Sequence, residues 1–299
     1  MSARRTTRVA ASLAVVCLLG LSGCQDDAAT PSDDPDRVVL EPPADGAGHT
    51  HAPGQDDPTT VGDGTTTSAG GYRLDGVRLP RGTDGPGGLS FRVLGRDGQP
   101  LRDYTEEQTK LLHLYLVRSD LAVFRHLHPT MAADGTWSAR ADLGSPGDYR
   151  LIADFVPAGT ESTVILGADV TVPGQWQPDR EQPTGDDGVL KVRVDGSGTV
   201  GPDGRLRLVV SSLDDRPVTL GSYLGAAAHV SGFRTDGDDP RGRTFVHVHP
   251  YGAPEDGEDG TVLTFHTTFE KAGDYRLFVQ VRVGGLLHTV PVTARVAGP

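Results

Sequence analysis

The stretch HLYLVRSDLAVFRHLHP, from His113 to Pro129, decides the fold, because it consists of two alternating apolar runs around the polar pair Ser119-Asp120. Such a pattern predicts two antiparallel strands joined by a two-residue hairpin loop. That loop places His113 directly opposite His126. Since side chains alternate between the two faces of a strand, we expect His113, His126 and His128 to project from one face.

The same pattern occurs a second time later in the chain. The motif HLHP at residues 126–129 recurs as HVHP at 247–250, and GDYRL at 147–151 recurs at 273–277. His113 corresponds to His229. The second hairpin is longer, because five extra residues lie near its tip, and we expect it to keep His229 opposite His247 with His249 on the same face. A repeat of domain length predicts tandem domains, since solenoid repeats are much shorter.

Composition and patterning together predict an all-β protein. The chain holds 40 glycines and 22 prolines, its apolar runs are short and alternating, and none has helical periodicity. We therefore expect two tandem immunoglobulin-like antiparallel β-sandwiches. The predicted boundaries are a first sandwich at 72–173, a linker at 174–187 and a second sandwich at 188–299.

The N-terminal part of the chain predicts export and lipid anchoring. Residues 1–23 combine early arginines with an apolar run too short to span a bilayer, and they read as a signal peptide. Leu21-Ser-Gly-Cys24 resembles the bacterial lipobox, which implies acylation of Cys24 and an address on the outer face of the cell membrane. The alternative is an ordinary secretory signal with a cysteine near its cleavage site. Residues 24–71 are polar and Pro-rich, and predict a disordered tether.

Cysteine use and charge limit the chemistry. The chain has two cysteines, Cys17 inside the predicted signal peptide and Cys24 at the predicted anchor, so the processed protein has no free thiolate. Any metal site must then use imidazole and oxygen ligands. The formal net charge of -12 argues against nucleic acid as a partner.

Three same-face histidines in each repeat predict a metal site in each domain. Directly opposed Cβ atoms lie about 4.5–5.5 Å apart, which lets two imidazoles share one ion. Asp154 is the candidate fourth ligand of the first repeat, and Gln280 is its counterpart in the second. Imidazole with carboxylate favours divalent copper, zinc or nickel, and Met131 leaves an opening for copper(I). The alternative is structural: histidines at strand ends hydrogen-bond loop carbonyls and fix the hairpins.

Four further histidines receive no firm role. His49 and His51 lie in the predicted tether, where they could bind a metal weakly, but ordinary tether composition explains them as well. His266 and His288 are extra imidazoles of the second repeat. The sequence does not fix their geometry.

The segments 113–121, 124–129 and 147–151 resemble secreted, actinobacterial-type proteins described as heavy-metal-binding. These are similar to YtkA-like and CopC-like copper-resistance domains, which are immunoglobulin-like sandwiches. The resemblance covers both repeats and implies copper or a similar ion as the cargo. In that pattern a further histidine commonly stands where this chain has Gln108. The N-terminal histidine of many CopC-like sites is excluded here by an acylated Cys24.

The leading functional hypothesis is therefore a membrane-anchored metal-binding lipoprotein that acts as a chaperone, buffer or sensor. A metal-transport or other envelope protein would be its partner. The alternative is a structural or protein-interaction lipoprotein whose histidines stabilise hairpins. We do not expect an enzyme, because the sequence has no Gly-x-Ser-x-Gly, no His-Glu-x-x-His and no activated cysteine.

Overall fold

The computed structural model describes residues 59–179, 184–201, 204–236, 243–250, 252–266 and 269–298, without the side chains of residues 249 and 250. The expected signal peptide, Cys24, and the two tether histidines His49 and His51 lie outside these ranges. Every regular element within them is a β-strand. In the described part of the chain, no helix could cross a membrane. Both sandwiches belong to one compact unit.

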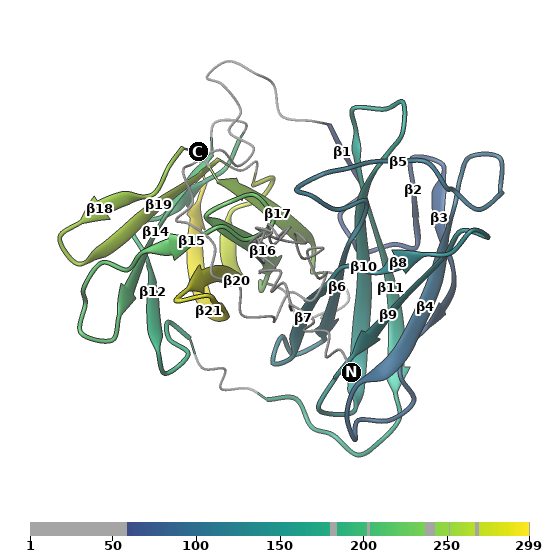
Figure 1. The fold of residues 1–299 in the computed structure, drawn as a ribbon, viewed down its shortest axis with the longest axis horizontal. Helices are drawn as coiled ribbons and strands as arrows, with labels where there is room; N and C mark the ends of the chain where they lie inside the picture. Colours follow the sequence, from purple (N-terminus) through teal and green to yellow (C-terminus); the bar gives the residue numbers. More distant parts are fainter. Residues whose placement is uncertain are drawn as a thin grey trace, which may run out of the picture. The chain divides into compact units, whose positions relative to one another are not determined.

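The first sandwich consists of two sheets, drawn in blue to teal in Figure 1. One sheet has the order β2 (Ser68–Ala69), β3 (Tyr72–Arg78), β4 (Gly87–Leu94), β9 (Thr136–Ala141), β8 (Thr130–Met131). The other has the order β1 (Thr60–Val61), β11 (Thr163–Val172), β10 (Gly147–Pro157), β6 (His113–Arg118), β7 (Phe124–Leu127), with β5 (Tyr104–Thr105) paired to β10. Alternating apolar residues of both sheets fill the core between them.

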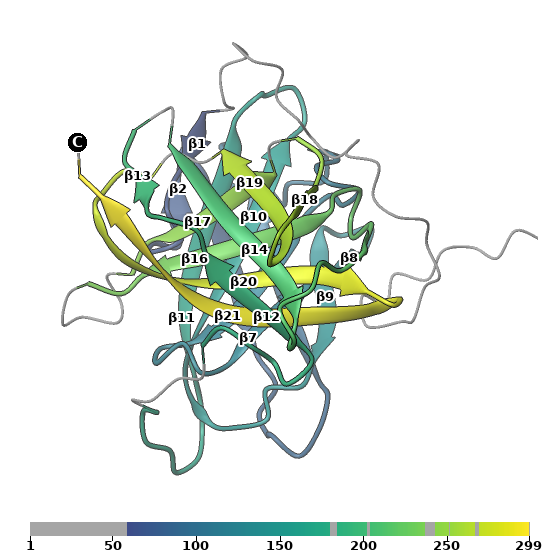
Figure 2. The ribbon, with the colours of Figure 1, turned by 90° about the vertical axis from the view of Figure 1, so that its left-hand side faces the viewer.

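The second sandwich repeats this plan. Its strands β12 (Leu190–Val194), β14 (Arg205–Ser212) and β19 (Gly260–His266) form one sheet, and β18 (Glu255–Gly257) pairs with β19. The other sheet has the order β17 (Phe245–Pro250), β16 (Ala228–Arg234), β20 (Gly273–Val283), β21 (Leu286–Ala297), β13 (Gly198–Thr199), with β15 (Leu220–Gly221) paired to β20. The long strands β20 and β21 run side by side in Figure 2. Because β17 also pairs with β19, the two sheets join into one.

Strand order confirms the predicted fold class of two tandem immunoglobulin-like sandwiches. The series β6, β7, β10 and β11 has the same neighbours as β16, β17, β20 and β21. Even the short strands correspond, because β1 pairs parallel to β11 as β13 does to β21. The internal repeat is therefore a repeat of complete sandwiches.

The first sandwich begins earlier than the predicted boundary at residue 72. Strands β1 and β2 lie within the range predicted as tether. The segment is held by backbone contacts, since Gly167 N donates to Thr66 O at 2.8 Å. Composition misled the prediction, because a segment that pairs through its backbone needs few large apolar side chains.

The hairpin registers differ from the prediction by two residues. Tyr115, rather than His113, lies opposite His126, and Ser231, rather than His229, lies opposite His247. A shift of two keeps every side chain on its predicted face, whereas a shift of one would have reversed the faces. The expectation that the histidines of the first hairpin share a face is therefore correct despite the wrong register.

Asp120 explains the register of the first hairpin. Its carboxylate accepts two hydrogen bonds of 2.8 Å from Arg118 and one of 3.1 Å from Ala122 N. Leu121 at the turn adopts a φ of 63°, and Arg118 N pairs with Val123 O at 2.9 Å. The loop thus has four residues instead of two, because it wraps around a buried carboxylate.

A third apolar cluster joins the two sandwiches. Phe124 of β7 stacks on Phe278 of β20 with ring centroids 4.2 Å apart and planes 4° apart. The cluster draws on both sandwiches and comprises Tyr115, Val117, Leu121, Phe124, Ile152, Ile165, Phe233, Phe245 and Phe278. The faces of β6, β7 and β10 that carry the candidate site are consequently packed against the corresponding faces of β16, β17 and β20.

Gly167→Ala tests whether the segment before residue 72 belongs to the fold. A Cβ at this position would lie 1.8 Å from Gly64 O, so we expect a loss of about 1–3 kcal/mol in the free energy of unfolding, measured by urea denaturation. Gly88→Ala is the matched control, because a Cβ there meets nothing within 4 Å. Equal stability of both variants would show that residues 64–66 do not pack on β11.

Candidate metal centre

Five histidines from the two sandwiches meet in one buried cluster. His113 and His126 stand on β6 and β7, His128 follows β7, and His229 and His247 stand on β16 and β17. His113, His126 and His229 are 2%, 6% and 1% exposed. The described histidines of the two predicted sites therefore lie in a single shared cluster.

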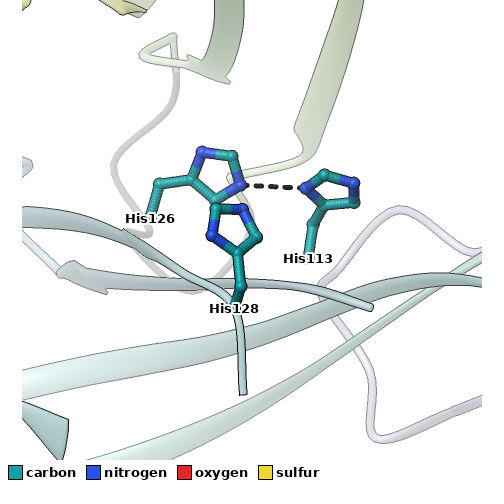
Figure 3. A group of neighbouring side chains, drawn as sticks. All are labelled: His113, His126 and His128. Atoms are coloured by element: carbon teal, nitrogen blue, oxygen red, sulfur yellow. Dashed lines mark hydrogen bonds between the residues drawn. The ribbon is translucent and has the colours of Figure 1, made fainter. Parts of the chain in front are cut away.

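Within the cluster, His113, His126 and His128 form a trio whose rings turn toward one another (Figure 3). Each offers one ring nitrogen, and these nitrogens all lie within 4.8 Å of one another. The ring centroids are 4.7–5.3 Å apart. The shortest approach is 3.1 Å, between His113 Nδ1 and His126 Nε2.

Loop carbonyls fix the first histidine of each sandwich. Glu107 O accepts a hydrogen bond of 3.0 Å from His113 Nε2, and Tyr223 O accepts one of 3.0 Å from His229 Nε2. A carbonyl oxygen can only accept, so Nε2 carries the proton in both rings. Each neutral ring then has its lone pair on Nδ1.

The second histidine of each hairpin is bound by the other sandwich. His126 Nδ1 donates to Gln280 Oε1 at 2.7 Å, and His247 Nδ1 donates to Asp154 Oδ2 at 2.9 Å. Asp154 and Gln280 occupy equivalent positions. Asp154 of β10 lies opposite His113 of β6, and Gln280 of β20 lies opposite His229 of β16. The structure thus places Asp154 as a partner of His247 and not as a member of the first-sandwich trio.

These bonds leave two lone pairs facing each other. The proton of His113 is on Nε2 and that of His126 is on Nδ1, so the atoms 3.1 Å apart are both acceptors. On the other side of the amide, Gln280 Nε2 donates to Thr289 Oγ1 at 3.3 Å. Bonds of about 2.0–2.1 Å to one ion would place adjacent ligand nitrogens roughly 3 Å apart. The contact has the spacing of two ligands of one cation.

Further nitrogens of the cluster are buried without a hydrogen bond. Neither His128 Nδ1 nor His128 Nε2 has a partner among the described residues, and the same holds for His229 Nδ1. A buried polar atom left unsatisfied costs about 1–3 kcal/mol. Unsatisfied buried polar atoms are rare in folded proteins, and a bound ion or water is one explanation for them.

Burial keeps His113, His126, His128 and His229 neutral. Desolvation, together with the charges of neighbouring histidines, lowers the pKa of His113 to about 4 and that of His128 to about 2. Desolvation also holds the pKa of His126 and of His229 well below the usual value, again with the help of neighbouring histidines. Neutral imidazole is the form that binds metal ions.

The remaining predicted residues lie apart from the trio or are not described. The side chain of His249 is outside the described residues, and its backbone pairs with His266 between β17 and β19. His288 Nδ1 binds Asp187 Oδ2 at 2.7 Å. Met131 packs against the core of the first sandwich. Gln108, in the loop beside Glu107, is buried, and its Oε1 has no hydrogen-bond partner within the described ranges.

Sequence reasoning missed Gln280 as a contact of His126. The equivalence of Asp154 and Gln280 was the available signal. It identified the positions, but only the packing of one sandwich on the other shows that each side chain serves the opposite repeat.

A family model matches residues 76–172 and 184–298. The chain belongs to the family described as Domain of unknown function (DUF8832). No match was found among curated proteins. This DUF8832 protein is similar to solved structures at TM-scores of 0.18–0.25. InvD of Yersinia pseudotuberculosis is 12% identical over 76% of this chain and 58% of its own, with a TM-score of 0.25. Invasin, a bacterial integrin-binding protein, is 14% identical over 76% of this chain and 39% of its own, with a TM-score of 0.20. Titin A168–A169 is 14% identical over 75% of this chain and 95% of its own, with a TM-score of 0.18.

We expect the metal-free protein to lose stability as the pH falls from about 6.5 toward 4. The folded-state pKa values of His113, His126, His128 and His229 are below their unfolded values. The stabilisation is therefore complete above the unfolded pKa and declines as protons bind the unfolded chain. Each histidine contributes a slope of roughly 1.4 kcal/mol per pH unit in this window. Urea denaturation at several pH values in the presence of a chelator measures the slope. A flat profile from pH 7 to 5 would contradict the buried, neutral cluster.

Proposed function

We propose that this DUF8832 protein binds a divalent transition-metal ion at His113, His126 and His128. The observation that carries the proposal is the 3.1 Å approach of His113 Nδ1 and His126 Nε2, inside a trio of converging nitrogens. With the tautomers set by Glu107 O and Gln280 Oε1, both of these nitrogens are acceptors. A cation between them would replace the repulsion by two bonds. Nothing else within the described residues satisfies both atoms.

The outer contacts of the histidines support the same proposal. Metal-bound histidines usually donate their other ring N–H to a carbonyl or carboxylate, which fixes the tautomer and the ring orientation. Here Glu107 O serves His113, and Gln280 Oε1 serves His126. A neutral nitrogen ligand set without thiolate favours Cu(II), Zn(II) or Ni(II).

The cellular setting completes the proposal. A lipid on Cys24 would hold the protein on the outer face of the cell membrane, where it would act as a chaperone, buffer or sensor for the ion. The similarity of the histidine motifs to YtkA-like and CopC-like domains favours copper. An envelope or metal-transport protein would exchange the ion with it.

A purely structural role for the histidines is the second candidate. The bonds from Glu107 O and Tyr223 O favour it, since each fixes a loop to the first histidine of its sandwich. These bonds use only Nε2 of His113 and His229. They give no reason for His128 to be nearly buried with both nitrogens unpaired.

We propose binding and not catalysis. A cavity of about 340 Å³ lies beside Arg118, Arg150 and Arg243, and none of the site histidines lines it. A substrate in that cavity would not touch an ion held by the trio.

His126→Ala should abolish stoichiometric binding of Cu(II), Zn(II) and Ni(II), because it removes His126 Nε2, the nitrogen that lies 3.1 Å from His113 Nδ1. The measurement is metal titration of the purified full-length protein in detergent, with His49 and His51 replaced by alanine to remove tether binding. His288→Ala is the matched control, since His288 is engaged with Asp187 and should leave binding unchanged. Undiminished binding by the His126 variant would refute the site.

Gln280→Glu separates the metal role from the structural one. A carboxylate can only accept from His126 Nδ1, so it fixes the tautomer that leaves Nε2 for the ion and makes the ring a stronger ligand. We expect metal affinity to rise by roughly tenfold, the lower end of the effect of such partners. A competition titration against a chromophoric chelator measures it. Lower affinity in a normally folded variant would contradict the proposed tautomer.

Cys24→Ser tests the anchor. The variant should lose incorporation of radiolabelled palmitate and leave the membrane fraction, because a diacyl group supplies the stable attachment. Cys17→Ser, inside the predicted signal peptide, is the control and should label normally. Equal labelling of both variants would rule out Cys24 as the acylated residue.

A further inference from the structure

We propose that the second sandwich completes the metal centre: His229 Nδ1 supplies the fourth nitrogen to the ion held by His113, His126 and His128. This inference rests on the proposed function and concerns the same site. The ion would then have ligands from both sandwiches and would link them, an arrangement we call the clasp.

The state of His229 is the first observation. Its Nε2 is occupied by Tyr223 O at 3.0 Å, which leaves the lone pair on Nδ1. That atom is buried and has no hydrogen-bond partner among the described residues. Tyr223 O thus fixes the tautomer of His229 in the same way as Glu107 O fixes that of His113, although the two histidines come from different sandwiches.

The position of the ring is the second observation. The His229 centroid lies 6.0 Å from that of His126 and 6.3 Å from that of His113. With bonds of about 2.0–2.1 Å, the centre of an imidazole lies roughly 3.2 Å from its ion, and two rings at a tetrahedral angle have centres about 5.2 Å apart. The trio, at 4.7–5.3 Å, already has this spacing. His229 would reach it by approaching about 1 Å closer.

The surroundings of the cluster favour an enclosed cation. His247 lies beside both His113 and His229, with centroid distances of 6.0 Å and 6.2 Å. It brings the Asp154 carboxylate, at 2.9 Å from its Nδ1, into the shell around the ion. A carboxylate in this shell offsets part of the charge of a buried divalent ion.

A fourth protein ligand changes what the centre can do. Sites with four protein ligands are closed and structural, whereas catalytic sites keep one position open for water or substrate. A closed site that draws ligands from both sandwiches is suited to holding an ion and to reporting its presence through the sandwich contact.

The test measures the ligand set of the full-length protein in detergent loaded with one equivalent of Cu(II). Electron paramagnetic resonance should show four coordinated nitrogens in the parent protein and three in His229→Ala. The affinity of the variant should fall at least about tenfold, the loss that even an outer-shell partner produces. The comparison is made in the background without His49 and His51, and His288→Ala is again the control.

Hydrogen exchange gives a second readout that needs no variant. Zn(II) should slow exchange at the backbone amides of β16 as well as those of β6, because the ion links both strands. If His229→Ala fails to fold, this measurement and the nitrogen count of the parent protein decide.

The outcomes separate the two proposals. Loss of binding in His126→Ala, with an unchanged nitrogen count and affinity in His229→Ala, would overturn the clasp and leave the trio standing. Zn(II) binding without added protection of β16 would also overturn the clasp. A parent protein that binds none of the three ions would overturn both.

Discussion

The exchange of hydrogen bonds between the sandwiches is the constraint on which the site depends. His126 of the first sandwich binds Gln280 of the second, and His247 of the second binds Asp154 of the first. Each bond sets the tautomer of its histidine and therefore the direction of the remaining lone pair. The apolar cluster around Phe124 and Phe278 excludes water beside these bonds. Burial in turn lowers the pKa of His126 and keeps its ring neutral.

The two halves of the repeat are similar, but they differ chemically at the positions of Asp154 and Gln280. The carbonyls of Glu107 and Tyr223 bind equivalent histidines at the same distance of 3.0 Å. Asp154 and Gln280, by contrast, place an acid in one half and an amide in the other. A carboxylate at both of these buried positions would place two like charges in the same cluster, which is unfavourable. The asymmetry retains the hydrogen bonds and avoids that cost.

The fold and the shared face of the histidines could be predicted from the sequence, because strand alternation is a local property. The face assignment is correct despite an error of two residues in register, because only a shift by an odd number of residues moves side chains to the other face of the sheet. The register itself depended on Asp120, whose bonds to Arg118 no periodicity reveals. The contacts of His126 with Gln280 and of His247 with Asp154 could not be predicted, because they depend on how two complete sandwiches pack.

Strand β1 gives the chain a mechanical property. It pairs in parallel with β11, so a pull on the chain before Thr60 loads β1 in shear along its length. Two residues after this strand, Asp63 O accepts a hydrogen bond of 2.9 Å from Phe245 N, at the start of the strand that carries His247. Tension from the N-terminal side would therefore reach both sandwiches next to the histidine cluster, and the load path from the proposed anchor would pass beside the proposed metal ligands.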